Sequence, residues 1–165
     1  MLILLENLVM TRINTIDVQD LTDQHLMAEY REMPMVHAAL QRSKTSKKGL
    51  SLDSIPPKYT LNTGHVKFFY NKGTFILKRY LALVDELRKR GYNINPGERK
   101  IDWKVFDHTL KSDWTPTPRD HSILIARLVE RINAKPQWYK LKGKPIGDDY
   151  LNKLAEKYDV KIDTL

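Results

Sequence analysis

Apolar residues recur at helical spacing in the first half of the chain. Within residues 21–42 the repeating positions are Leu26, Met27, Tyr30, Met33, Val36 and Leu40. This spacing predicts a helix, and either Thr22 or Asp20 suits its N-cap. Pro34 has no backbone N–H to donate, so we expect a kink or a break in the helix at this residue.

A second and longer apolar stripe lies within residues 64–90. Its positions are Val66, Phe69, Tyr70, Ile76, Tyr80, Leu83, Val84 and Leu87. We expect a single helix here, closed by Gly91 as a C-cap. Gly73 would be a weak point inside it, because glycine costs about 1 kcal/mol relative to alanine in a helix interior.

The C-terminal third carries two further helix signals. The sequence Thr-Pro-Arg-Asp at residues 117–120 is typical of a helix start, and this helix should end before Pro136. Further on, Asp148 or Asp149 suits the N-cap of a terminal helix. The apolar face of that helix would consist of Leu151, Leu154, Ala155 and Tyr158.

The segments between these helices read as loops. Residues 43–58 are rich in Ser, Lys and Gly and predict a long basic loop, and residues 92–117 predict irregular structure with one short helix around 102–110. No strand pair with turn chemistry is apparent. We therefore expect an all-α fold: a single compact domain of three main helices with long loops, plus a short C-terminal helical extension. The expected divisions are an N-terminal extension, the compact domain and the C-terminal extension, at residues 1–9, 10–146 and 147–165.

Composition narrows the class of protein. The chain has 165 residues, 41% hydrophobic and 29% charged, which suits one folded domain with a core. It has no cysteine, which excludes disulfides and thiolate chemistry and suits a reducing, cytoplasmic compartment. No apolar run approaches the ~20 residues of a membrane span. We expect a soluble protein that acts as a monomer, without membrane contact.

The charge balance points to a polyanionic partner. Lysine and arginine total 28 against 20 acidic residues, a formal net charge of +8, which suits nucleic acid. Net charge alone leaves the function open.

The pair Met10-Thr11 suggests amine chemistry. Were Met10 the first residue made, its removal before the small Thr11 would leave a free α-amine. An α-amine has a pKa of about 7.8 against about 10.4 for lysine, so a far larger fraction is unprotonated near neutral pH. Only the unprotonated amine attacks an electrophilic carbon to form an imine.

Four blocks of sequence carry a family resemblance. They are residues 10–14 (MTRIN), 23–32 (DQHLMAEYRE), 64–70 (GHVKFFY) and 135–140 (KPQWYK), the last followed by Gly143-Lys144. In this order they resemble the pyrimidine-dimer DNA glycosylases with AP-lyase activity, the phage endonuclease V type of ultraviolet-damage repair enzyme. The resemblance runs from Met10 to about Ile146.

The resemblance implies a cofactor-free DNA-repair enzyme. Its partner would be double-stranded DNA that contains pyrimidine dimers or abasic sites. In the family, the N-terminal threonine amine attacks the anomeric carbon of the 5′ nucleotide of the dimer, which breaks the glycosyl bond and forms an imine. β-Elimination then nicks the strand.

The resemblance also implies a set of site residues. The catalytic amine would belong to Thr11 and the essential carboxylate to Glu32, with no metal. The residues that correspond to DNA contacts are Arg12, Gln24, His25, Arg31, Arg127 and Arg131.

Several of these residues have a plainer reading from the sequence alone. Glu32 suits a solvated or salt-bridged helix residue near Arg31, and His25 suits a capping or core histidine. Arg127 and Arg131 lie four residues apart, which suits either adjacent phosphate contacts or a solvated helix face.

Three departures from the family bear on function. Met35 stands where an arginine is common, and Leu141-Lys142 stand where the best-known member is aromatic. The third is the nine residues before Met10. Because Leu2 would prevent trimming from Met1, we expect translation to begin at Met10. The alternatives are a non-catalytic basic DNA-binding module and a lyase that nicks abasic sites but ignores dimers.

Overall fold

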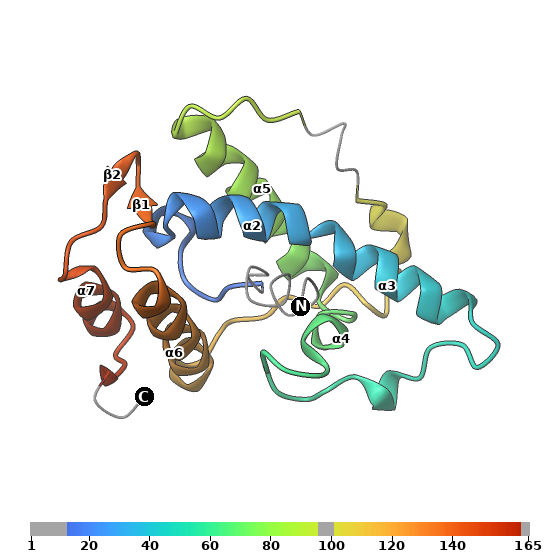
Figure 1. The fold of residues 1–165 in the computed structure, drawn as a ribbon. Helices are drawn as coiled ribbons and strands as arrows, with labels where there is room; N and C mark the ends of the chain where they lie inside the picture. Colours follow the sequence, from blue (N-terminus) through green and yellow to red (C-terminus); the bar gives the residue numbers. More distant parts are fainter. Residues whose placement is uncertain (1–12, 96–100, 163–165) are drawn as a thin grey trace, which may run out of the picture.

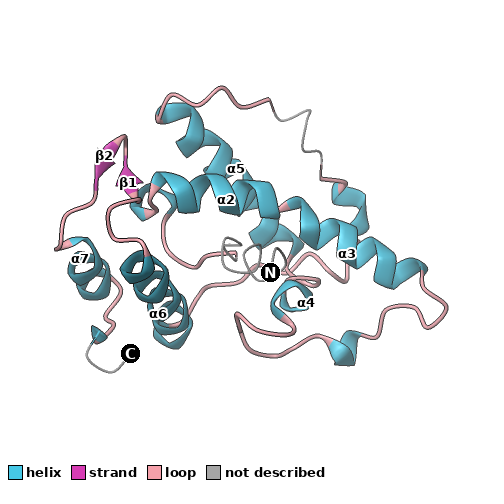
Figure 2. Cartoon of the chain, in the orientation of Figure 1, coloured by secondary structure: helices cyan, strands magenta, loops and turns pink. Residues whose placement is uncertain are grey.

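The fold is built almost entirely of helices (Figures 1 and 2). A computed structural model describes residues 13–95 and 101–162. The all-α fold expected from the sequence is confirmed. Thr11 and Arg12, two of the expected site residues, lie outside the described residues.

The first apolar stripe forms two helices that run end to end (Figure 1). Helix α2 (Asp23–Glu32) and helix α3 (Pro34–Thr45) meet at Met33, so the break expected at Pro34 is confirmed. The Met33 N–H still donates to Glu29 O at 2.9 Å, which keeps the two helices nearly in line. Thr22 is the N-cap, and its hydroxyl accepts a hydrogen bond from the His25 N–H at 3.2 Å.

The second stripe does not form the single helix that we expected. It forms a short helix α4 (His65–Phe68) and a longer helix α5 (Gly73–Lys89). Gly73 begins α5 instead of weakening its interior. Its N–H donates to Leu110 O at 2.8 Å, and a Cβ there would lie 2.7 Å from Cβ of Phe106. The close approach of residues 106–110 requires glycine at this position.

Gly91 closes α5 as predicted. It has a φ of 93°, and Tyr92 N–H donates to Leu87 O at 3.0 Å across it. This 6→1 hydrogen bond is the signature of a Schellman motif.

Helix α6 (Pro118–Ala134) starts and ends where the sequence predicts. Thr117 and Asp120 form a complete capping box, and the helix stops before Pro136. Helix α7 (Tyr150–Lys157) also forms, with Asp149 at its N-cap position. The Asp149 side chain makes no cap hydrogen bond, because it pairs with Lys153 at 2.7 Å.

Two expectations about the loops need correction. A small antiparallel hairpin joins β1 (Lys140–Leu141) to β2 (Lys144–Pro145), where we expected no strand pair. Its turn residues Lys142 and Gly143 have φ values of 52° and 81°, the left-handed conformation of a two-residue hairpin turn. The short helix expected around residues 102–110 is only a 3₁₀ turn, η4 (Trp103–Val105). Strands of two residues show too little alternation to be read from sequence.

The remaining loops are largely as expected. The basic loop after α3 begins only beyond Thr45 and contains a 3₁₀ turn, η2 (Leu52–Ser54). Another 3₁₀ turn, η1 (Val18–Asp20), precedes α2.

The core lies where α2 crosses α5 (Figure 1). Beside it, Tyr59 and Trp114 stack with ring centroids 5.4 Å apart, and Phe68 and Phe69 contact both rings in T-shaped, edge-to-face arrangements. Helices α6 and α7 pack on one another at the other end of the molecule. Within the described residues, every helix is too short or too polar to cross a membrane.

Candidate functional site

The chain that leads into η1 is held by buried polar contacts. The Ile13 N–H donates to Nε2 of His65 at 3.0 Å, and the Tyr59 hydroxyl donates to Ile13 O at 2.8 Å. Nδ2 of Asn14 donates to Oε1 of Glu29 at 2.5 Å. Three different parts of the fold therefore fix the first two described residues.

A buried ion pair lies beneath this segment. Nε and Nη2 of Arg79 on α5 donate to the two carboxylate oxygens of Glu29 on α2, at 2.6 and 2.9 Å, and Nη1 donates to Ile16 O. Burial would lower the pKa of Arg79, but the charge and hydrogen bond of Glu29 raise it. The Glu29 carboxylate is fully engaged in structure, so it is not free for chemistry.

Glu32, the expected catalytic carboxylate, is the last residue of α2. It lies three residues after Glu29, so both side chains project from one face of the helix. Glu32 is half-buried, and its Oε1 atom is shielded from solvent.

At the opposite end of α2, His25 has the contacts of a core histidine. Its ring is 2% exposed and stacks on Tyr139 at 4.7 Å. Burial, with a contribution from the nearby charge of Arg131, lowers the pKa of His25 to about 4. His25 is therefore neutral near pH 7, and its position in the free protein fits the core alternative that the sequence left open.

Gln24 holds the segment before the hairpin. Its Nε2 donates to Trp138 O at 2.6 Å, and its Oε1 accepts from the Lys140 N–H at 3.0 Å. Trp138 is 50% exposed, with the Lys135 ammonium 5.1 Å from its ring centroid. A basic and aromatic surface is thus anchored to the head of α2, while Tyr139 packs inward on His25.

Asp23 holds the hairpin turn itself. Its Oδ1 accepts from the Lys142 N–H at 3.0 Å and its Oδ2 from the Gly143 N–H at 2.8 Å. Arg90 also donates to Oδ1 at 2.9 Å, so the carboxylate forms an ion pair with a buried guanidinium.

The arginines fall into different surroundings. Arg31 is exposed in the last turn of α2. Arg127 is half-buried on α6, with its Nε 3.7 Å from Glu130. Burial, reinforced by Glu29, raises the pKa of Tyr59, while the charges of Arg79 and Arg127 act in the opposite direction. Arg127 is therefore close to the phenol that holds Ile13.

The expected site residues do not form one cluster. Gln24, His25 and Arg131 gather around residues 138–140, whereas Glu32 lies one helix length away, about 12 Å at 1.5 Å per residue. Arg127 lies instead near Tyr59, whose hydroxyl bonds Ile13 O. Among the described residues, no three His, Asp or Glu side chains are grouped as a metal site requires.

The residues that hold Ile13 were not among the expected site residues. Tyr59 was not singled out, and His65 appeared only within a matched block. Glu29 and Arg79 lie on the core faces of predicted helices, and no local signal pairs residues 50 positions apart.

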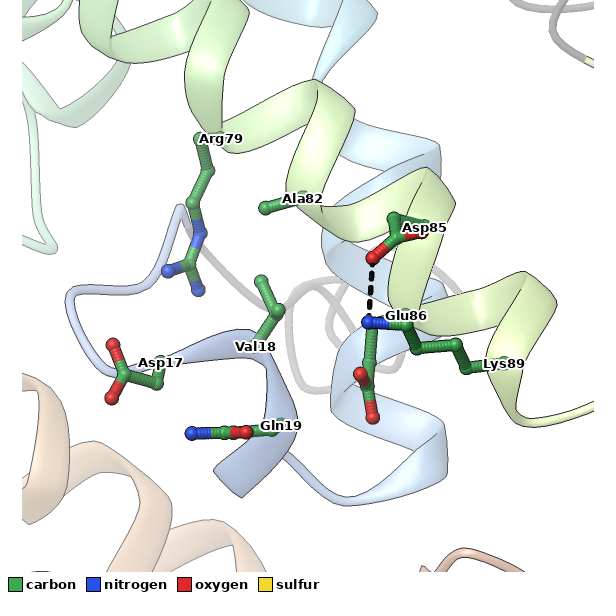
Figure 3. Close-up of a pocket in the computed structure, with 8 residues that line it drawn as sticks. All are labelled: Asp17, Val18, Gln19, Arg79, Ala82, Asp85, Glu86 and Lys89. Carbon is green, nitrogen blue, oxygen red and sulfur yellow. Dashed lines mark ion pairs between the residues drawn. The ribbon is translucent and has the colours of Figure 1, made fainter.

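A pocket of about 340 Å³ lies elsewhere, between η1 and α5 (Figure 3). None of the expected site residues lines it. Its charges are already paired, with Nζ of Lys89 2.9 Å from Asp85 and Arg79 bonded to Glu29. Asp17 pairs with Lys157 and Glu86 with Arg90, so none of the charged side chains that line this pocket lacks an ion-pair partner.

These features define a class of protein. A mostly helical, strongly basic chain with arginines on α2 and α6 has the features of a protein that binds nucleic acid.

The family follows from comparison with known sequences. Residues 10–99, more than half of the chain, match the family model described as pyrimidine dimer DNA glycosylase. The chain therefore belongs to this family, as its resemblance implied, and is a DNA glycosylase of pyrimidine-dimer repair that takes DNA as its substrate. The match includes Thr11, Glu32 and His65 and ends before α6.

Proposed function

We propose that the enzyme breaks the glycosyl bond of the 5′ base of the dimer through an imine on the Thr11 α-amine and then nicks the strand as an AP lyase. The amine nitrogen bonds to the anomeric carbon of the 5′ nucleotide of the dimer, and the glycosyl C–N bond breaks. The electron pair of that bond leaves with the base. Loss of the amine proton and opening of the sugar ring give the imine.

Strand nicking follows from the same intermediate. Removal of a 2′ proton and departure of the 3′ phosphate, with its C–O bond pair, complete β-elimination. Water then hydrolyses the imine and returns the amine. Apart from water, these steps need no oxidant, reductant or other co-reactant.

The observation that carries this proposal is the match over residues 10–99 together with the held position of Ile13. The match includes Thr11, and the structure fixes the backbone two residues later. The mechanism requires that Thr11 be the first residue of the working enzyme, which production from Met10 and removal of that methionine would provide.

Glu32 is the proposed catalytic carboxylate. Its half-buried place at the end of α2, on the face that Glu29 turns toward Asn14, supports this role. A carboxylate beside the forming imine stabilises the cationic sugar and helps to move the 2′ proton.

The proposed DNA contacts come from several elements. Arg31, Arg127 and Arg131 supply guanidinium groups for phosphates, and Arg12 acts beside the amine. Gln24 and His25 contribute by holding residues 138–140, since the side-chain amide of Gln24 already bonds this segment. We assign the glycosylase machinery to residues 10–146, with residues 147–165 as an extension that packs on it, and expect the enzyme to act as a monomer.

Reductive trapping tests the imine. The protein is made from its native gene, its N-terminal residue is identified by mass, and it is incubated with borohydride and either a dimer duplex or an abasic duplex. A covalent adduct with both is expected. An adduct with the abasic duplex alone would favour the lyase that ignores dimers, and no adduct with either would overturn the imine.

A further inference from the structure

Ile13 is held at both of its backbone polar groups by two side chains of residues 59–65, in the loop before α4 and at the start of that helix. His65 accepts from its N–H at 3.0 Å, and the Tyr59 hydroxyl donates to its carbonyl at 2.8 Å. Both side chains are buried, with 3% and 1% of their surface exposed. Residues 59–65 therefore fix the peptide groups on either side of Ile13.

The partners of His65 define its tautomer. Its Nδ1 lies 2.7 Å from Thr60 O, and because a carbonyl only accepts, Nδ1 carries the proton. Nε2 is then the unprotonated acceptor that the Ile13 N–H needs. The carbonyl of Thr60, in the loop before α4, therefore holds His65 in the tautomer that accepts from the Ile13 N–H.

Tyr59 is equally well fixed. Its ring lies within the aromatic cluster, stacked on Trp114 and edge-on to Phe68 and to His65. Burial raises the pKa of its phenol, so the hydroxyl remains a hydrogen-bond donor. A rigid ring carries the donor to Ile13 O.

Resting on the proposed function, we propose that Tyr59 and His65 are positioning residues for the catalytic amine. Two residues span at most about 7 Å, so fixing Ile13 limits the volume that the Thr11 amine searches. Nearby, the Asn14 amide bonds Glu29 on the face of α2 that also carries Glu32. The backbone at residues 13–14 and the proposed catalytic carboxylate are therefore both positioned relative to helix α2.

The consequence is kinetic. A nucleophile must approach its carbon to within about 3–3.5 Å with the correct direction, and a misplacement of about 1 Å costs up to about 100-fold in rate. Loosening Ile13 should therefore slow imine formation and leave DNA affinity, which depends on the arginines, nearly unchanged.

The test compares two matched substitutions. Tyr59→Phe removes the hydroxyl that bonds Ile13 O, and Tyr150→Phe removes a hydroxyl that donates to Asp20 O at 2.6 Å. Each loses one tyrosine-to-backbone hydrogen bond in the same N-terminal stretch. Borohydride trapping of an abasic duplex is measured with enzyme in excess, alongside Kd and Tm.

We expect Tyr59→Phe to trap about tenfold more slowly than the unmodified protein with Kd within about twofold, and Tyr150→Phe to trap at the unmodified rate. Equal trapping by both variants and the unmodified protein would overturn the positioning role. Equal slowing by both variants would also overturn it, because general loosening of the fold would then explain the loss.

Substitutions of His65 provide a second, independent test. His65→Gln keeps a donor and an acceptor near the imidazole positions, whereas His65→Ala keeps neither. We expect the glutamine variant to retain more trapping activity than alanine at matched occupancy of DNA, and equal activities would contradict the proposal. Absence of trapping by the unmodified protein would instead overturn the imine mechanism itself, and the positioning role with it.

Discussion

Two glutamates three residues apart have opposite roles at the residue scale. Glu29 is fully buried and bonded to Arg79 and Asn14, whereas Glu32 is half-buried at the helix end. A charge that completes a buried pair serves stability, because removing it leaves its partner uncompensated. Glu32 lies instead at the end of the helix, in the position proposed for the catalytic carboxylate.

Paired substitutions separate these roles. Glu32→Gln should abolish base release while damaged-DNA binding and Tm stay near those of the unmodified protein. Glu29→Gln should lower the free energy of unfolding by about 3 kcal/mol or more, because it breaks a buried pair. Denaturant unfolding, gel-shift binding and base-release assays read these effects. Base release by Glu32→Gln at the unmodified rate would remove Glu32 from the mechanism.

His25 predicts a pH dependence of stability. Burial lowers the pKa of His25 to about 4 in the folded protein, below the ordinary value of 6.5. The unfolded chain therefore takes up a proton first as the pH falls, and stability contributed by neutral His25 is lost between pH 6.5 and about 4. The slope is at most about 1.4 kcal/mol per pH unit.

His25→Phe keeps a ring against Tyr139 and removes the titration. Its free energy of unfolding should fall less steeply than that of the unmodified protein over the same pH range. Parallel urea titrations at several pH values measure the difference. Identical pH profiles would contradict a lowered pKa of His25 in the folded protein.

At the scale of elements, α7 is an integral part of the fold. Nζ of Lys157 lies 3.1 Å from Asp17 and 2.6 Å from Asp20, and the Tyr158 hydroxyl accepts from the Asp17 N–H at 2.8 Å. The Tyr150 hydroxyl also donates to Asp20 O. The C-terminal extension therefore packs on the N-terminal stretch through η1.

Removing residues 147–165 should consequently destabilise the protein. The buried side chains of Tyr150 and Leu154 would be lost, and burial of each such side chain contributes roughly 1.5–3 kcal/mol. Thermal unfolding should show a clear decrease in Tm. A truncated chain with unchanged Tm would instead support an independent domain that ends at residue 146.

Local sequence signals predict the ends of several helices, but contacts between residues distant in sequence are not predictable in this way. Helix starts and ends that depend on local chemistry, at residues 117–120 and at Gly91, were correct because capping needs only neighbouring residues. The break before Gly73 was missed because its cause is Phe106, distant in sequence. The contacts of Tyr59 and His65 with Ile13 were missed for the same reason.

At the scale of the whole molecule, the net charge of +8 predicts strongly salt-dependent DNA binding. If Arg127 neutralises a phosphate, Arg127→Gln should reduce the slope of log affinity against log salt by about 0.9. Lys153→Gln is a matched control, because Lys153 is an exposed cation paired with Asp149 on α7. Equal slopes for both variants would argue against a phosphate contact by Arg127.

The whole account depends on which nitrogen joins the DNA, and peptide mapping of the borohydride adduct tests this directly. The predicted result is an adduct on the α-amine of Thr11, in a protein whose mass shows Thr11 as its first residue. An adduct on a lysine would contradict the account. Lys72, whose pKa burial lowers to about 8, is the rival to examine first.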